Sequence, residues 1–230
     1  MKRVTKKQSS KVRRFAAEIF KILHKKLKDK YTFTVRLVGS VAWNTVLRDS
    51  DGFWDVDYQI LLTKNSKEYK VNRLNNPTDI KSSFLREFNK IFKDDKNYKI
   101  ENSTTAITLI DKKNKYSIDF VIIKLYPSNN EIIRRNNKKD SSINEFTWNQ
   151  LPKFNEAYKK FNKLCPMQKK DLIENYVLPR KEKEKKKPDN DKTKRSSSEI
   201  LIEEINNYEI GKWNYWLQWK QGRHPSLDKT

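Results

Sequence analysis

The sequence predicts an α+β or α/β fold whose strands are concentrated in the first 125 residues. Between residues 31 and 125, several short segments alternate apolar and polar side chains as strands do, and a helical pattern separates them. From residue 152 onward, apolar residues recur at helical spacing instead. We therefore expect a sheet flanked by helices, followed by a smaller helical C-terminal part.

The first predicted element is a helix over residues 11–28, with the serines at 9–10 as its N-cap. Its apolar residues follow helical spacing: Val12, Phe15, Ala16, Ile19, Leu23 and Leu27. A strand over residues 31–38 comes next, and a short turn or helix is expected over residues 39–45. The DSDG sequence at 49–52 predicts a turn, because Asp, Ser and Gly favour turns.

The middle of the chain predicts three further strands and one helix. An aromatic and apolar strand is expected over residues 54–62, and a helix opens at residues 76–79 with the sequence NPTD. Strands over residues 104–110 and 116–125 are joined by the polar loop DKKNK, which predicts a hairpin.

The C-terminal part is predicted to be helical, with Pro166 interrupting the helical spacing. Residues 179–198 carry no apolar side chain that could be buried, and they predict a charged flexible linker. Ser196 and Glu199 form a capping-box pattern before a last helix over residues 200–208, which Gly211 is expected to end. The predicted organisation is a core domain at 1–150, a helical extension at 151–178, the linker at 179–198 and a C-terminal helical segment at 199–230.

The net charge of +22, from 51 Lys and Arg against 29 Asp and Glu, predicts attraction to polyanions such as RNA and nucleotides. Lysine enrichment without a specific partner explains the same excess, and both interpretations stay open. The single cysteine, Cys165, excludes an internal disulfide framework and a cysteine-based zinc site. No apolar run approaches the roughly 20 residues that span a bilayer, and the basic N-terminus lacks an apolar region. We expect a cytoplasmic protein without a membrane partner.

Aspartates are the candidate chemical groups. Asp55 and Asp57 project from the same face of a predicted strand, and Asp119 lies within an otherwise apolar one. Neighbouring carboxylates repel one another unless a cation lies between them, and Mg²⁺ is the expected cation because it prefers oxygen ligands. Asp49 and Asp51 lie in the predicted turn, where turn capping is the simpler interpretation.

Gly39 and Ser40 lie where a predicted strand ends and a helical turn begins. Backbone N–H groups at such a place bind phosphate, and a small residue allows close approach. A Gly-Ser pair after a strand is common, so this pair gains meaning only from the aspartates that follow it.

A Gly-Ser pair at a strand end, Asp-x-Asp on the next strand and a third Asp on a later strand resemble the nucleotidyltransferase superfamily of the DNA polymerase β type. The match looks closest to the oligoadenylate synthetases, cyclic GMP-AMP synthase and their bacterial relatives. Members often read Gly-Ser-x-x-x-Gly-Thr, and this chain has GSVAWNT with Asn44 in the glycine place. Asn tolerates positive φ better than other non-Gly residues do. The chain departs from the pattern in the fourteen residues between Ser40 and Asp55 and in a short segment after Asp119.

The resemblance implies a mixed sheet flanked by helices and an enzyme that transfers a nucleoside monophosphate from an NTP to a hydroxyl, releasing pyrophosphate. A cyclic or linear oligonucleotide second messenger is one implied product. The implied ligands of Mg²⁺ or Mn²⁺, which are also the catalytic residues, are Asp55, Asp57 and Asp119. The implied nucleotide-binding residues are Gly39, Ser40, Asn44 and Thr45.

Two alternatives remain open at the level of the sequence. One keeps the chemistry and changes the acceptor to tRNA or a protein, as toxin-like nucleotidyltransferases do. The other is a non-catalytic RNA-binding protein on the same scaffold, using the lysine-rich residues 180–195 and a C-terminal group of Trp213, Trp216 and Trp219. These features also have simpler explanations, a solvated linker and a helical face packed on the protein.

Overall fold

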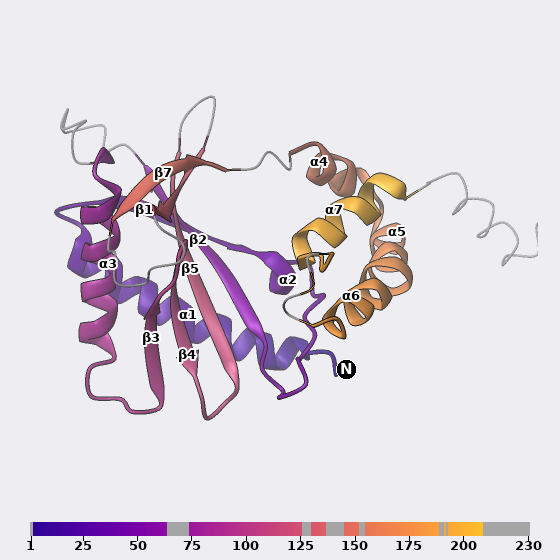
Figure 1. The fold of residues 1–230 in the computed structure, drawn as a ribbon, viewed down its shortest axis with the longest axis horizontal. Helices are drawn as coiled ribbons and strands as arrows, with labels where there is room; N and C mark the ends of the chain where they lie inside the picture. Colours follow the sequence, from indigo (N-terminus) through magenta and orange to yellow (C-terminus); the bar gives the residue numbers. More distant parts are fainter. Residues whose placement is uncertain are drawn as a thin grey trace, which may run out of the picture. The chain divides into compact units, whose positions relative to one another are not determined.

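The computed structural model describes residues 2–63, 74–125, 130–136, 145–151, 155–188, 191 and 193–208 of the 230-residue chain. The chain divides into two compact units, residues 1–152 and residues 153–230. The first unit contains the sheet, and the elements described in the second unit are helices (Figure 1). The predicted α+β class is therefore confirmed.

Seven strands form one mixed sheet within the described residues. They are β1 (Thr32–Val38), β2 (Asp55–Thr63), β3 (Tyr98–Asn102), β4 (Ala106–Asp111), β5 (Tyr116–Lys124), β6 (Glu131–Arg135) and β7 (Phe146–Gln150). The order is β1-β2-β5-β4-β3, with β6 beside β5 and β7 beside β6. β2 and β5 run parallel, and every other pair is antiparallel. The predicted hairpin is β4–β5, so that prediction is confirmed.

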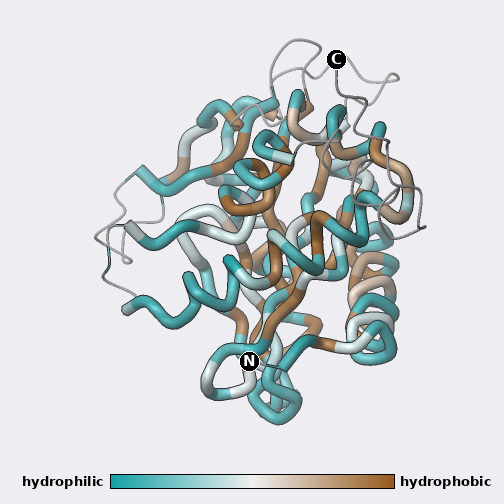
Figure 2. Tube along the Cα trace, turned by 90° about the vertical axis from the view of Figure 1, so that its right-hand side faces the viewer, coloured by the Kyte–Doolittle hydropathy of each residue, from teal (hydrophilic) through white to brown (hydrophobic). Residues whose placement is uncertain are grey.

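One face of this sheet is covered by α1 (Lys6–Leu27) and α3 (Pro77–Ile91). Alternate residues of the central strands, such as Val56, Ile60 and Phe120, are fully buried in the core against these helices. In Figure 2 the colour of the helices changes repeatedly between hydrophilic and hydrophobic along the coil, as expected for helices that bury one face. The other face of the sheet therefore carries the polar residues of the same strands, including the aspartates.

The first unit differs from the prediction at several boundaries. α1 begins at Lys6 rather than at residue 11, because Thr5, not the serine pair, caps it and forms a capping box with Gln8. The strands β3, β6 and β7 were not predicted. Each has only five residues with few apolar positions, and each is stabilised by pairing with a neighbouring strand rather than by its own pattern.

The second unit contains α4 (Asn155–Lys163), α5 (Pro166–Asp171), the π-helix η2 (Leu172–Val177), α6 (Leu178–Lys185) and α7 (Ser197–Asn207). The helical segment is interrupted before Pro166, as predicted, and Pro166 is the first residue of the next helix, α5. Ser196 caps α7 in a capping box with Glu199, so the last helix is confirmed. Gly211 and the three C-terminal tryptophans lie outside the described residues.

The prediction of a flexible linker at 179–198 is wrong for its first part, because the helix α6 extends from Leu178 to Lys185. Arg180 donates to Glu204 (2.6 Å) and to Glu203, both on α7. The Glu184 carboxylate accepts from the Lys187 ammonium (2.8 Å) and from the backbone N–H of Arg195 (3.0 Å). Ion pairs and hydrogen bonds thus satisfy charges that the composition alone suggested would stay in water.

No helix in the described part of the chain is both long and apolar enough to cross a membrane.

Candidate active site

The three predicted aspartates lie on the face of the sheet opposite α1 and α3. The parallel register of β2 and β5 pairs Asp57 with Asp119 and Asp55 with Ser117. Paired residues of neighbouring strands project to the same face, and such strands lie about 4.8 Å apart. Sequence alone places Asp55 and Asp57 on one face, and the strand pairing adds Asp119 beside them.

Asp55 is exposed at the start of β2, and its Oδ1 accepts a hydrogen bond of 2.5 Å from the Ser117 hydroxyl. Ser117 precedes Asp119 by two residues on β5, so it shares the same face of the sheet. Sequence reasoning missed this serine, because its role depends on which strand lies beside β2.

Asp119 is held by a short chain of hydroxyl groups. Its Oδ1 accepts a hydrogen bond of 2.6 Å from the Thr108 hydroxyl, whose oxygen lies 3.2 Å from that of Ser103. Burial raises the pKa of Asp119, the Thr108 hydrogen bond opposes this rise, and the negative charge of Asp55 adds to it. Thr108 was missed, although the hairpin with Asp111 opposite Tyr116 already places Thr108 opposite Asp119.

Gly39 lies directly against the Asp57 carboxylate. It follows β1, whose last residue Val38 pairs with Asp57, and it begins the short helix α2 (Gly39–Ala42) with a φ of +64°. A Cβ added to Gly39 would lie 2.0 Å from Asp57 Oδ2 and 2.8 Å from its Cγ. Glycine is therefore required here for two reasons, the left-handed backbone and the space that Asp57 occupies.

The rest of the GSVAWNT segment closes into a compact loop. The backbone N–H of Thr45 donates to the Ser40 carbonyl (2.9 Å), and Thr45 itself is buried. Asn44 has a φ of +56°, which agrees with an Asn replacing Gly at this position. The Arg3 guanidinium donates to the Asn44 carbonyl at 2.7 Å. These bonds fix the loop, so Gly39 and Ser40 keep a defined position beside β2.

The DSDG turn lies outside this arrangement. The backbone N–H of Gly52 donates to the Asp49 carbonyl (3.2 Å), and Asp49 Oδ1 accepts from the N–H of Phe53 at 2.7 Å. The predicted turn is confirmed, with Asp49 acting as its capping side chain.

The three aspartates fit a divalent cation by residue type and register. Carboxylate oxygens are the ligands that Mg²⁺ and Mn²⁺ prefer, and the charge of Asp55 that raises the pKa of Asp119 is one that a cation would offset. Yet in the part of the chain that the structure describes, no three or more His, Cys, Asp or Glu side chains gather closely enough to hold a metal. Asp55 and Asp119 each direct one carboxylate oxygen, Oδ1, toward a hydroxyl group, that of Ser117 and that of Thr108 respectively.

Comparison with known proteins found similarity only at the level of structure, since no family model and no curated protein matches the sequence. The chain is similar to a STING-associated CdnE c-di-GMP synthase from Capnocytophaga granulosa, with a TM-score of 0.63 and 20% identity over 94% of this chain and 65% of that one. It is also similar to the Vibrio cholerae DncV cyclic AMP-GMP synthase, described as a prokaryotic cGAS homolog, with a TM-score of 0.55 and 14% identity over 77% of this chain and 46% of that one.

The chain has the nucleotidyltransferase fold of these synthases. The resemblance drawn from Gly39-Ser40 and the aspartates is thus confirmed for the fold. A GTP-bound form of Vibrio cholerae DncV is similar as well, with a TM-score of 0.55 and 16% identity over 84% of this chain. This chain spans 65% or less of the length of each of these three structures.

Proposed function

We propose that this protein is a metal-dependent nucleotidyltransferase that transfers a nucleoside monophosphate from an NTP to a hydroxyl group and releases pyrophosphate. The observation that carries the proposal is the register of β2 and β5, which sets Asp57 beside Asp119 with Gly39 packed on Asp57. The nucleotidyltransferase fold also supports the proposal, because the sheet that carries these aspartates belongs to a chain with that fold.

Asp55, Asp57 and Asp119 are the residues that we assign to hold Mg²⁺ or Mn²⁺. The cation, when bound, supplies charge neutralisation for the triphosphate and lowers the pKa of the attacking hydroxyl. Thr108 and Ser117 orient Asp119 and Asp55 by hydrogen bonds of 2.6 Å and 2.5 Å.

The loop from Gly39 to Thr45 is assigned to the triphosphate. Gly39 has no side chain to obstruct a phosphate, and Ser40 adds a hydroxyl donor at the strand end. The Thr45–Ser40 and Arg3–Asn44 hydrogen bonds hold this loop in one conformation before substrate arrives. Such preorganisation lowers the cost of ordering the loop on binding.

We further propose that the product is an oligonucleotide, cyclic or linear. The support is that two of the similar structures are described as a c-di-GMP synthase and a cyclic AMP-GMP synthase, and that a third is a GTP-bound form. GTP is therefore the first substrate to test, alone and together with ATP.

The test is incubation of the protein with all four NTPs and Mg²⁺ or Mn²⁺, followed by measurement of pyrophosphate and separation of the products by mass. Asp57→Asn removes one carboxylate charge from the site and is expected to abolish pyrophosphate release while leaving the protein folded. Asp51→Asn makes the same chemical change at an exposed residue of the DSDG turn and serves as the matched control. Undiminished turnover by Asp57→Asn would overturn the assignment.

A further inference from the structure

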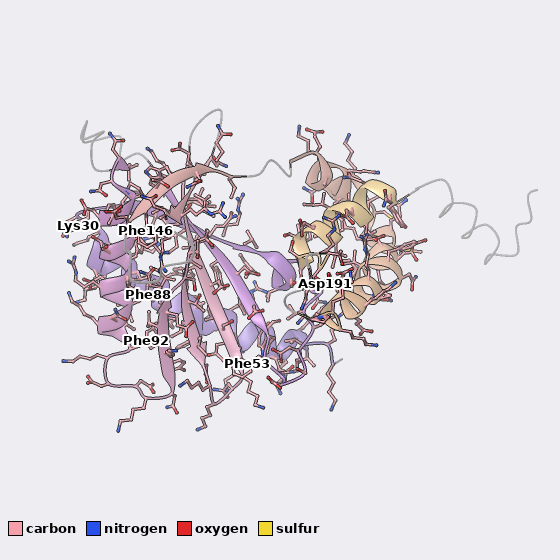
Figure 3. The ribbon with its side chains drawn as sticks, in the orientation of Figure 1. Lys30, Phe53, Phe88, Phe92, Phe146 and Asp191 are labelled. Atoms are coloured by element: carbon pink, nitrogen blue, oxygen red, sulfur yellow. The ribbon has the colours of Figure 1, made fainter. Side chains whose placement is uncertain are left out.

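A second feature of the first unit is a cavity of about 440 Å³ beside α3, and none of the three aspartates is among its described lining residues. It is lined by Lys81, Ser82, Leu85, Arg86, Asn89, Lys90, Lys93, Asn102 and Phe146. Seven of these residues come from α3 and the turn after it, Asn102 ends β3, and Phe146 begins β7. Phe146 lies beside α3 in Figure 3. Among the lining residues that the structure describes, four side chains are cationic and none is a carboxylate.

Lys81 is the unusual residue of this cavity, because its side chain is only 1% exposed. Its ammonium donates to the Ser103 carbonyl at 2.6 Å and lies 4.2 Å from the centroid of the Phe146 ring. Burial, and then the positive charge of Arg135, lower the pKa of Lys81 to about 7. The cavity thus contains a lysine whose charge the protein itself stabilises poorly.

Arg135 adds a second buried cation next to Lys81. Its guanidinium lies 5.7 Å from the centroid of the same Phe146 ring and donates to the Asn102 carbonyl at 2.5 Å. Within the described part of the chain, its Nε is buried and has no hydrogen-bond partner. Among the described residues, neither Lys81 nor Arg135 has a carboxylate within ion-pair distance. Buried cations without a counter-charge are costly, and an anion bound beside them offsets that cost.

Within the described residues, Glu87 is the acidic side chain that forms ion pairs with the lining cations. The Glu87 carboxylate pairs with Lys90 at 2.9 Å and with Arg86 at 3.5 Å, and one carboxylate shared by two cations leaves the lining cations with a net positive charge. The aliphatic stems, Leu85 and the Phe146 ring provide the apolar walls. Cationic groups around a small apolar hollow match a compact anion with several charged oxygens.

We propose that this cavity is a binding site for a small phosphate-bearing anion, separate from the nucleotidyltransferase site. Lys81 would contact the ligand at the base of the cavity, and Arg86, Lys90 and Lys93 would contact it from the α3 side. A small ligand is favoured over a nucleic-acid backbone because Lys81 is buried, whereas a polymer running over the surface contacts exposed cations. The inference does not depend on the proposed transferase activity.

The test is calorimetric titration of the full chain with inorganic tripolyphosphate in EDTA, which removes divalent cations from the aspartate site. Asp57→Asn is used as the background, so that binding near the aspartates is further reduced. We expect one ligand per chain. Lys81→Met and the double variant Arg86→Gln/Lys90→Gln are each expected to weaken binding about tenfold or more, since a charge-assisted hydrogen bond contributes about 1.5 kcal/mol or more.

The double variant Lys25→Gln/Lys26→Gln removes the same charge from exposed positions on α1 and is the matched control. Equal weakening in this control, or no change in Lys81→Met, would show non-specific attraction and overturn the site. The amine signal of Lys81 in NMR spectra provides a second readout, because a bound anion raises the pKa of Lys81. An unchanged Lys81 signal at saturation would also contradict the proposal.

Parallel titrations with GTP and with a short single-stranded RNA identify the kind of ligand. Binding of tripolyphosphate or GTP that requires Lys81 supports the small-anion site. Binding of RNA alone, through Arg86 and Lys90 but without Lys81, would assign this surface to nucleic acid instead and reject the proposal.

Discussion

Gly39→Ala tests whether the close packing of Gly39 on Asp57 positions the proposed metal-binding carboxylate. The new Cβ would occupy a residue with a φ of +64°, which costs a non-Gly residue about 1–2 kcal/mol. It would also lie 2.0 Å from Asp57 Oδ2, far inside the usual contact distance, so Asp57 must move. Overpacking of this kind costs about 1–3 kcal/mol. We expect Gly39→Ala to lose about 2–5 kcal/mol of unfolding free energy.

Gly52→Ala is the matched control, because Gly52 also has a positive φ, +87°, but its added Cβ would come no closer than 3.7 Å to Lys115 Cδ. This variant incurs the backbone cost without the collision, so it should lose only about 1–2 kcal/mol. Urea unfolding of both variants separates the two contributions. In the nucleotide-transfer assay, Gly39→Ala should lose about 100-fold in turnover because Asp57 is displaced, whereas Gly52→Ala should retain its activity.

A double-mutant cycle isolates the contact itself. Asp57→Ala removes the carboxylate that the new Cβ would strike, so Gly39→Ala should cost less stability in that background than in the wild type. An equal loss in Gly39→Ala and Gly52→Ala, no coupling in the cycle, and full turnover by Gly39→Ala would together refute the packing argument.

Three further changes test other parts of the structure. Asp119→Asn should raise the unfolding free energy of the metal-free protein at pH 7. Burial raises the pKa of Asp119, so the folded state favours the protonated carboxyl group. The stability that this group contributes is therefore complete below about pH 4 and is lost as the pH rises through the folded-state pKa. Urea unfolding in EDTA measures this, and a less stable variant would contradict it. Lys81 has a folded-state pKa of about 7 against 10.5 unfolded, so stability should rise by about 2 kcal/mol from pH 7 to pH 9 in the wild type and stay flat in Lys81→Met. The same change of unfolding free energy with pH in the wild type and in Lys81→Met would refute this prediction. Ser196→Ala should lose about 1 kcal/mol by breaking the capping box, with Ser197→Ala as control, and equal thermal unfolding of the two would argue against the cap.

Several elements were predictable because their signals are local. Helical spacing in α1 and α3, alternation in β2 and β5, and the loop between β4 and β5 depend on residues that are close in sequence. The same holds for the shared face of Asp55 and Asp57, since alternation along a strand needs no partner. Capping by Ser196 and Glu199 is a four-residue pattern and was predicted for the same reason.

The charged segment after residue 178 shows where composition misleads. Its lysines, arginine and glutamates suggested a chain that stays in water, but Arg180 meets Glu203 and Glu204 on α7 and forms part of a helix. The partners lie more than twenty residues further along the chain, so a count of apolar residues within the segment does not detect them.

The sequence by itself determined the candidate residues: an Asp-x-Asp pair on one strand face, a third aspartate in an apolar strand, and a glycine at a strand end. Only the tertiary structure decided that these belong to one site. Parallel pairing of β2 with β5 joins residues more than sixty positions apart and brings Asp119 beside Asp57. The same pairing brings Ser117 to Asp55, and β1–β2 pairing brings Gly39 onto Asp57. Strand neighbours are chosen by the packing of the whole sheet, and no local pattern specifies them.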